Sequence, residues 1–146
     1  MRFFASRRLF PRGIVLALGF AALLVVSCQA QAASSGVIVP ISAVHGYPGH
    51  GTAVFKTGPG TNQYTVTVNM AGLSPGDHPE HIHQGVCPNP GKIAVPLTTL
   101  HAGSDGNASA TTTVNGALSS VTDGQHSVNV HQADLTQIAC GTIPKS

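Results

Sequence analysis

The stretch Tyr64-Thr65-Val66-Thr67-Val68-Asn69-Met70 decides the fold class of this 146-residue chain. Its apolar and polar residues alternate strictly, so one set of side chains faces a core and the other faces solvent when the segment is extended. This pattern is typical of a β-strand with one buried face. After the first thirty residues, no apolar stretch shows the helical period.

The chain on both sides of this stretch has the same texture, with short Val/Thr/Ile-rich runs separated by Gly, Pro, Asn and Asp. We expect strands at residues 37–44, 52–56, 64–70, 81–83, 97–101, 108–114, 126–131 and 137–143. The turn at 104–107 predicts that the two strands beside it form a hairpin, and the Pro/Gly-rich segment 87–96 is expected to be an ordered loop. Seven or eight short strands favour one antiparallel sandwich or barrel, at residues 37–146.

The first 32 residues are expected to be a secretory signal, followed by a short linker at 33–36. Four arginines precede an uncharged, largely apolar run that is too short to span a membrane. Val25-Val26-Ser27-Cys28 matches a bacterial lipobox, which would leave Cys28 lipidated, whereas Ala30-Gln31-Ala32 matches an ordinary cleavage site. Both alternatives place the domain outside the cytoplasm, secreted, periplasmic or at the cell surface, with at most a lipid anchor to a membrane.

Removing the signal changes the charge of the protein. All the arginines lie in the signal, so three lysines and five acidic residues remain, with a net charge of −2. A protein that binds nucleic acid needs a basic face to neutralise phosphates. The composition therefore excludes nucleic-acid partners, and it gives no indication of the oligomeric state.

Two cysteines remain if Cys28 is removed or lipidated. Disulfides persist in exported proteins, and an even number of thiols favours a bridge between Cys87 and Cys140. The alternative is two unpaired buried thiols.

Histidine is the strongest chemical signal in the sequence, because all eight histidines lie after the signal. In His81-Ile82-His83 the two imidazoles point to the same side of an extended chain and can reach one ion, while Ile82 points into the core. The best third donor is His131, because Val128 and Val130 are expected to face the core and His131 the opposite side. Three neutral imidazoles suit copper or zinc.

The other histidines have weaker functional interpretations. We expect ordinary surface or core positions for His45, His50 and His126. We expect His101 to belong to a strand. No role is assigned to His78. Asp77 and Glu80 flank the histidine pair and could orient an imidazole. We expect these two acids to be solvated turn residues.

These segments resemble the copper/zinc superoxide dismutase family. Residues 72–83, Gly-Leu-Ser-Pro-Gly-Asp-His-Pro-Glu-His-Ile-His, are similar to the segment that carries the first two copper histidines of that family. Residues 128–134 resemble the segment with the last copper histidine, and residues 138–143 resemble the C-terminal strand with its cysteine. The resemblance covers nearly the whole chain after the signal. It implies an eight-stranded Greek-key β-barrel, a Cys87–Cys140 disulfide, and copper bound by His81, His83 and His131.

Two departures from the family pattern affect the expected activity. The segment after Cys87 has no histidine before His101 and no aspartate before Asp105, so the zinc subsite of the family is expected to be absent. Gln137 stands where the family places its active-site arginine. Cationic groups near such a metal attract superoxide and raise encounter rates by roughly 10–1000-fold. No catalytic side chain is expected beyond the metal ligands.

Three functions fit these observations. The first is slow dismutation of superoxide to dioxygen and hydrogen peroxide by a copper-binding member of the superfamily. The second is a non-catalytic extracytoplasmic copper-binding module. The third is a structural or adhesive domain that has lost metal chemistry, as in domains related to the chordin-type module. Whether the protein is an enzyme stays open at this point.

Overall fold

The computed structural model describes residues 36–146, and the predicted signal, the lipobox cysteine and residues 33–35 lie outside this range. Among the described residues, no helix is long and apolar enough to cross a membrane. The regular elements are ten β-strands and one short 3-10 helix: β1 (Val37–Ala43), β2 (His50–Thr57), β3 (Gln63–Ala71), β4 (Gly76–His78), β5 (Glu80–Gln84), β6 (Ile93–Pro96), β7 (Leu100–Ala102), β8 (Ala108–Asn115), η1 (Leu118–Ser120), β9 (His126–His131) and β10 (Gln137–Ile143).

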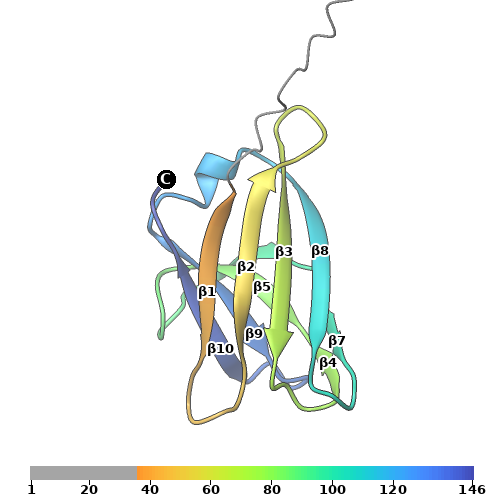
Figure 1. Ribbon diagram of the computed structural model, residues 1–146. Helices are drawn as coiled ribbons and strands as arrows, with labels where there is room; N and C mark the ends of the chain where they lie inside the picture. Colours follow the sequence, from red (N-terminus) through yellow and green to blue (C-terminus); the bar gives the residue numbers. More distant parts are fainter. Residues whose placement is uncertain (1–35) are drawn as a thin grey trace, which may run out of the picture. The chain divides into compact units, whose positions relative to one another are not determined.

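Eight of the strands form one curled antiparallel sheet in the order β6-β5-β9-β10-β1-β2-β3-β8. In Figure 1, β1, β2, β3 and β8 stand side by side in front, and β10, β9 and β5 run behind them at an angle. The remaining strands, β4 and β7, form a small second sheet. The loop after the edge strand β6 reaches the opposite edge strand, β8, where the Thr98 N–H donates to Thr112 Oγ1 at 2.8 Å. The predicted all-β, eight-stranded antiparallel class is confirmed.

The strand β3 has the alternation read from its sequence. Tyr64, Val66, Val68 and Met70 are buried in the core, and the intervening residues are half-buried or exposed. Partner residues on the neighbouring strands complete the core between the two layers. The largest fully buried apolar side chains are Tyr64, Phe55, Ile41, Ile82, Leu100, Ile138 and Ile143.

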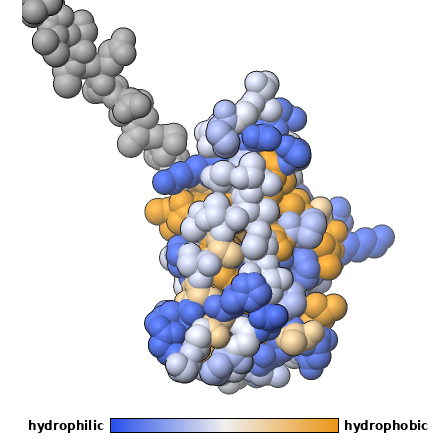
Figure 2. Space-filling view, turned by 90° about the vertical axis from the view of Figure 1, so that its right-hand side faces the viewer, coloured by the Kyte–Doolittle hydropathy of each residue, from blue (hydrophilic) through white to orange (hydrophobic). Residues whose placement is uncertain are grey.

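The edge strand β8 carries small polar side chains on its outer surface. The hydroxyl groups of Thr67 and Thr111 are hydrogen-bonded, with their oxygens 2.9 Å apart. Ser109 Oγ donates to Asn69 Oδ1 at 2.7 Å. In the view toward this side, pale residues of intermediate hydropathy run down the middle of the surface, with blue residues gathered near the bottom and orange ones at the flanks (Figure 2). The side of β8 is therefore covered by hydroxyl and amide groups rather than by charges.

Two local predictions are wrong. Residues 93–96, expected to belong to a loop, form the edge strand β6, where Pro96 is tolerated because an edge strand does not need every N–H for pairing. The predicted hairpin across residues 104–107 does not form, because β7 pairs with β4 rather than with β8.

The first and last strands of the domain are neighbours. Ser42 of β1 pairs with Cys140 of β10, and Ala43 pairs with Ala139. Gly141 allows the close approach, because a Cβ atom at that position would lie 2.5 Å from the Pro40 carbonyl oxygen. The N-terminal strand thus lies between β2 and the C-terminal strand.

A disulfide joins Cys87, in the loop after β5, to Cys140 in β10, across a sequence separation of 53 residues. The Cys87 N–H also donates to Thr142 Oγ1 at 3.1 Å, so the loop is held to β10 at two points.

Replacing both cysteines with serine is expected to lower the free energy of unfolding by about 2–4 kcal/mol, because the unfolded chain regains the freedom of a long open loop. Urea denaturation of the variant and of the oxidised parent measures the change. A difference within about 0.5 kcal/mol, the usual range for an inert surface substitution, would show that the bridge does not constrain the unfolded chain.

Candidate metal centre

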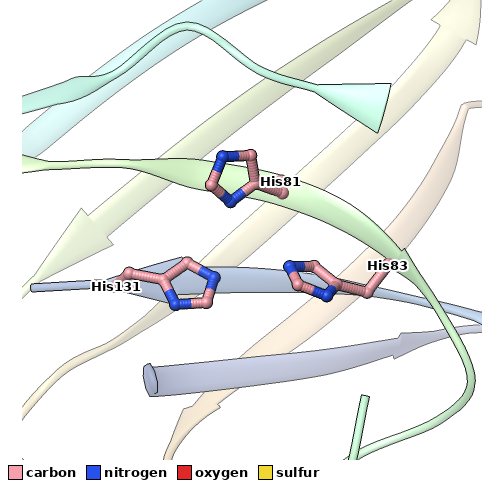
Figure 3. Close-up of side chains that lie close together, drawn as sticks. All are labelled: His81, His83 and His131. Carbon is pink, nitrogen blue, oxygen red and sulfur yellow. The ribbon is translucent and has the colours of Figure 1, made fainter. Parts of the chain in front are cut away.

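Three histidines gather on one face of two neighbouring strands. His81 and His83 lie on β5, where they pair with Asn129 and Ser127 of β9, and His131 ends β9. Figure 3 shows their rings next to one another on the same side of these strands. One ligand atom from each residue lies within 4.8 Å of the other two. The centroids of the rings are 5.2–5.7 Å apart.

Backbone carbonyl groups fix the orientation of two of these rings. His83 Nδ1 donates to the Gly91 carbonyl oxygen at 3.0 Å, and His131 Nδ1 donates to the Leu135 carbonyl oxygen at 3.1 Å. A carbonyl oxygen only accepts, so the proton of each neutral ring is on Nδ1 and the lone pair is on Nε2. The loops after β5 and β9 therefore set the tautomers.

The nitrogens left without a hydrogen-bond partner are those a metal would need. They are His81 Nδ1, His83 Nε2 and His131 Nε2, and all three are buried. Buried polar atoms without a partner are rare in folded proteins, and an ion that the structure does not contain is one explanation.

The donor set fits copper or zinc better than magnesium or calcium, because it contains three imidazoles and no oxygen ligand. Two nitrogens that bind one ion at about 2.0–2.1 Å can be at most about 4 Å apart. The ligand atoms of the three histidines lie within 4.8 Å of one another, which is slightly wider than this separation. A small inward movement of the rings would thus complete the site.

Burial keeps two of the imidazoles neutral. The pKa of His81 is lowered by burial first and then by the nearby His83. The pKa of His131 is lowered mainly by burial, against the opposing effect of its hydrogen bond to Leu135. Neutral imidazoles keep their lone pairs, so protons compete less with a metal for these two donors as the pH falls.

A fourth histidine, His78, supports the site from inside the protein and was not assigned from the sequence. It is 1% exposed, and its Nδ1 lies 2.9 Å from the carbonyl oxygen of His131 while its Nε2 lies 2.8 Å from that of Ser74. It therefore ties the turn before β4 to the end of β9. The feature of the sequence that could have indicated this role is the position of His78, three residues before His81.

The flanking acids do not contact the cluster. Asp77 Oδ1 accepts a hydrogen bond from His101 Nδ1 at 2.6 Å, and both side chains are exposed. Glu80, expected to be a solvated turn residue, is instead 1% exposed and its Oε2 has no hydrogen-bond partner. Burial raises the pKa of Glu80 to about 8.

The remaining histidines lie away from the cluster. His45 and His50 are exposed, and His126 Nδ1 lies 2.8 Å from Asp123 Oδ1. None of them belongs to a group of metal-ligating side chains within residues 36–146.

Two side-chain amides, those of Asn129 on β9 and Gln137 on β10, lie next to the histidines in the sheet. Asn129 is fully buried, and its Nδ2 donates to the Ser127 carbonyl oxygen at 3.3 Å and to Ser127 Oγ at 3.0 Å. Its Oδ1 accepts a hydrogen bond from Gln137 Nε2. Gln137, which pairs with His131 across β9 and β10, is thus bonded to a neighbouring amide.

The fold and the cluster together define a class: an all-β domain with the architecture of the superoxide dismutases and a group of three histidines on one face. A solved structure similar to this chain is the Cu/Zn superoxide dismutase from Brucella abortus, with 23% sequence identity and a TM-score of 0.52. The similarity covers 74% of this chain and 99% of that chain. At this level of identity it establishes a common fold and nothing more.

The family itself is given by the sequence. A model of the CHRD domain matches residues 29–137, and the chain therefore belongs to the CHRD domain family. No curated protein matches the chain. The resemblance to the dismutases noted in the sequence thus holds for the fold, while the family is the CHRD domain family.

Proposed function

We propose that this protein is an extracytoplasmic copper-binding protein that holds one copper ion through His81 Nδ1, His83 Nε2 and His131 Nε2. The observation that carries the proposal is the convergence of three buried ring nitrogens that have no hydrogen-bond partner. Export and lipidation at Cys28 stay predictions from the sequence.

Copper fits this set better than zinc. Sites built from nitrogen donors generally bind Cu²⁺ more tightly than Zn²⁺, and imidazole suits both ions. The number of ligands does not separate the two metals, because a structural zinc site usually has four protein ligands but a catalytic one has three and an open position, and this cluster has three. Among the described residues no cysteine, aspartate or glutamate joins the group to provide the fourth.

Metal stoichiometry tests the proposal directly. After loading with copper and removal of loosely bound metal by a chelator, native mass spectrometry should show one copper per chain, and a His81→Ala/His83→Ala variant should retain none. If the domain has only a structural role, this double variant will have the same fold and the same metal content as the parent, and the proposal will fail.

Superoxide dismutation is a second candidate function. It is favoured by the position of His81, which is only partly buried, so a small molecule can reach this side of the cluster. Bound copper would supply one-electron redox chemistry, oxidising one superoxide and reducing another. The protein's own contribution would be to hold the three rings and to leave one side open.

The surroundings of the cluster indicate that any dismutation would be slow. Residues 36–146 contain no arginine, and Gln137 is bonded to Asn129. We expect a second-order rate constant at least ~10-fold below the diffusional ceiling of about 10⁸–10⁹ M⁻¹ s⁻¹. It should not decrease as the ionic strength rises, because residues 36–146 carry a net charge of −2, which does not attract the anion.

Pulse radiolysis of copper-loaded protein at several ionic strengths measures this rate. A Gln137→Arg variant should raise it by about 10-fold at low salt and make it salt-dependent. A parent rate that already decreases steeply with salt would contradict the expectation. A chelator that removes loosely bound copper is the control: if the activity disappears with it while the protein keeps its copper, the enzymatic candidate fails and copper binding stands.

A further inference from the structure

The metal cluster is bordered by a chain of uncharged polar side chains. Ser127, Asn129 and His131 lie at alternate positions of β9 and so share one face of the sheet. Asn129 pairs with His81, and Gln137 pairs with His131. The three side chains Ser127, Asn129 and Gln137 therefore lie beside the histidines rather than behind them.

The hydrogen bonds of these side chains fix which way each amide faces. The Ser127 carbonyl oxygen can only accept, so the amide nitrogen of Asn129 must face it. Asn129 Oδ1 then faces Gln137 and accepts from its Nε2. Because Asn129 is fully buried, it has no solvent as an alternative partner. The Asn129 amide is thus hydrogen-bonded within the protein at both its nitrogen and its oxygen.

No negative charge accompanies the three imidazoles. No acidic or cysteine side chain joins the cluster among residues 36–146. Asp77 is bonded to His101 at the surface, and both Cys87 and Cys140 are in the disulfide. Glu80 and Ile82 point to the opposite face of β5, into the core, because they alternate with the two histidines.

A site of this kind does not suit the two oxidation states of copper equally. The cost of placing an ion in a poorly solvated environment rises steeply with its charge. Cu(II) also prefers a tetragonal arrangement with more than three donors. Here the protein offers three neutral donors and no charged one, so the singly charged ion loses less on binding.

We infer that the hydrogen-bonded pair Asn129–Gln137 makes this centre selective for cuprous over cupric copper. The inference rests on the proposed copper site and adds the residues that select the oxidation state. Asn129 and Gln137 are specificity-determining residues here, and they act by remaining neutral and bonded to each other. An anionic side chain at either position would compensate the extra charge of Cu(II).

Separate affinities for Cu(I) and Cu(II), measured by competition with chromophoric chelators specific for each ion, test the inference. The parent should bind Cu(I) with a dissociation constant at least ~100-fold lower than that for Cu(II). At 59 mV for each tenfold change, this ratio places the reduction potential of the bound copper about 118 mV above that of aqueous copper. Asn129→Asp should reduce the ratio by at least tenfold, which lowers the potential by about 59 mV.

Gln137→Glu makes the same charge change at a side chain that is only partly buried, and it replaces Asn129→Asp if that variant does not fold. The matched control is Asn115→Asp on β8, which is separated from β9 in the sheet by four strands. The inference is overturned if the acidic variants shift the ratio no more than this control does, or if the parent binds both ions equally. Failure of the parent to bind either ion would refute the copper site itself.

Discussion

Replacing His131 with alanine is expected to lower the affinity of the folded domain for Cu(I) by at least ~100-fold. Substitutions of residues that merely support a metal ligand typically cost about 10–100-fold in affinity. Loss of one of only three ligands should cost more, because no other histidine, cysteine, aspartate or glutamate joins the cluster among residues 36–146. Competition with a chromophoric Cu(I) chelator measures the change.

His126→Ala is the matched control for this variant. His126 lies on the same strand, β9, and its ring is bonded to Asp123 rather than directed at the cluster. Its removal should leave the copper affinity unchanged. The backbone N–H of His131 donates to the Pro79 carbonyl oxygen, and this bond survives the alanine substitution. Equal affinities for the two variants, both folded, would show that His131 is not a ligand.

Replacing Glu80 with glutamine is expected to stabilise the domain at neutral and alkaline pH. Burial raises the pKa of this carboxyl from its ordinary value of 4.5 to about 8. Between these values the unfolded chain has lost a proton that the folded domain still holds. The free energy of unfolding therefore falls as the pH rises through this window.

The size of the effect follows from the pKa difference. At about 1.4 kcal/mol for each pH unit, the ionisation of Glu80 in the unfolded chain lowers the stability by roughly 3 kcal/mol at pH 7 and roughly 4 kcal/mol at pH 8. Glutamine has a similar shape and does not ionise, so the difference between parent and variant should grow from near zero at pH 4.5 to these values.

Urea denaturation of both metal-free proteins across this pH range checks the prediction. The histidines are the same in both proteins, so their contribution cancels in the difference. The control is Asp134→Asn, which changes an exposed acid and should alter stability by no more than about 0.5 kcal/mol. A Glu80→Gln difference that does not change with pH would show that this carboxyl is already ionised in the folded state.

Alternation along single strands was enough to predict the class of the fold and one side of the metal cluster. It placed Val66 and Val68 of β3 in the core, and it turned His131 of β9 away from the core. Partners distant in the sequence could not be assigned in the same way. The Asp105-Gly106 turn is a local signal, and the pairing of β7 with β4 is decided by the packing of the whole domain.

The same reasoning explains what was missed around the cluster. The alternation that turns Ile82 inward also turns Glu80 inward, but a carboxyl is so rarely buried without a partner that a solvated position was expected. The two carbonyl groups that orient His83 and His131 belong to the loops at Gly91 and Leu135. No side-chain pattern in the sequence marks a backbone oxygen, so these contacts required the structure.

The pairing of β1 with β10 has a consequence for the order in which the protein is made and folds. The sheet has β1 in an interior position, next to a strand that is synthesised last. A nascent chain that lacks β10 has nothing to join β1 to β9, so the two halves of the sheet cannot assemble. Assembly of the whole sheet must then wait for β10, and sheets built from such distant pairings form slowly.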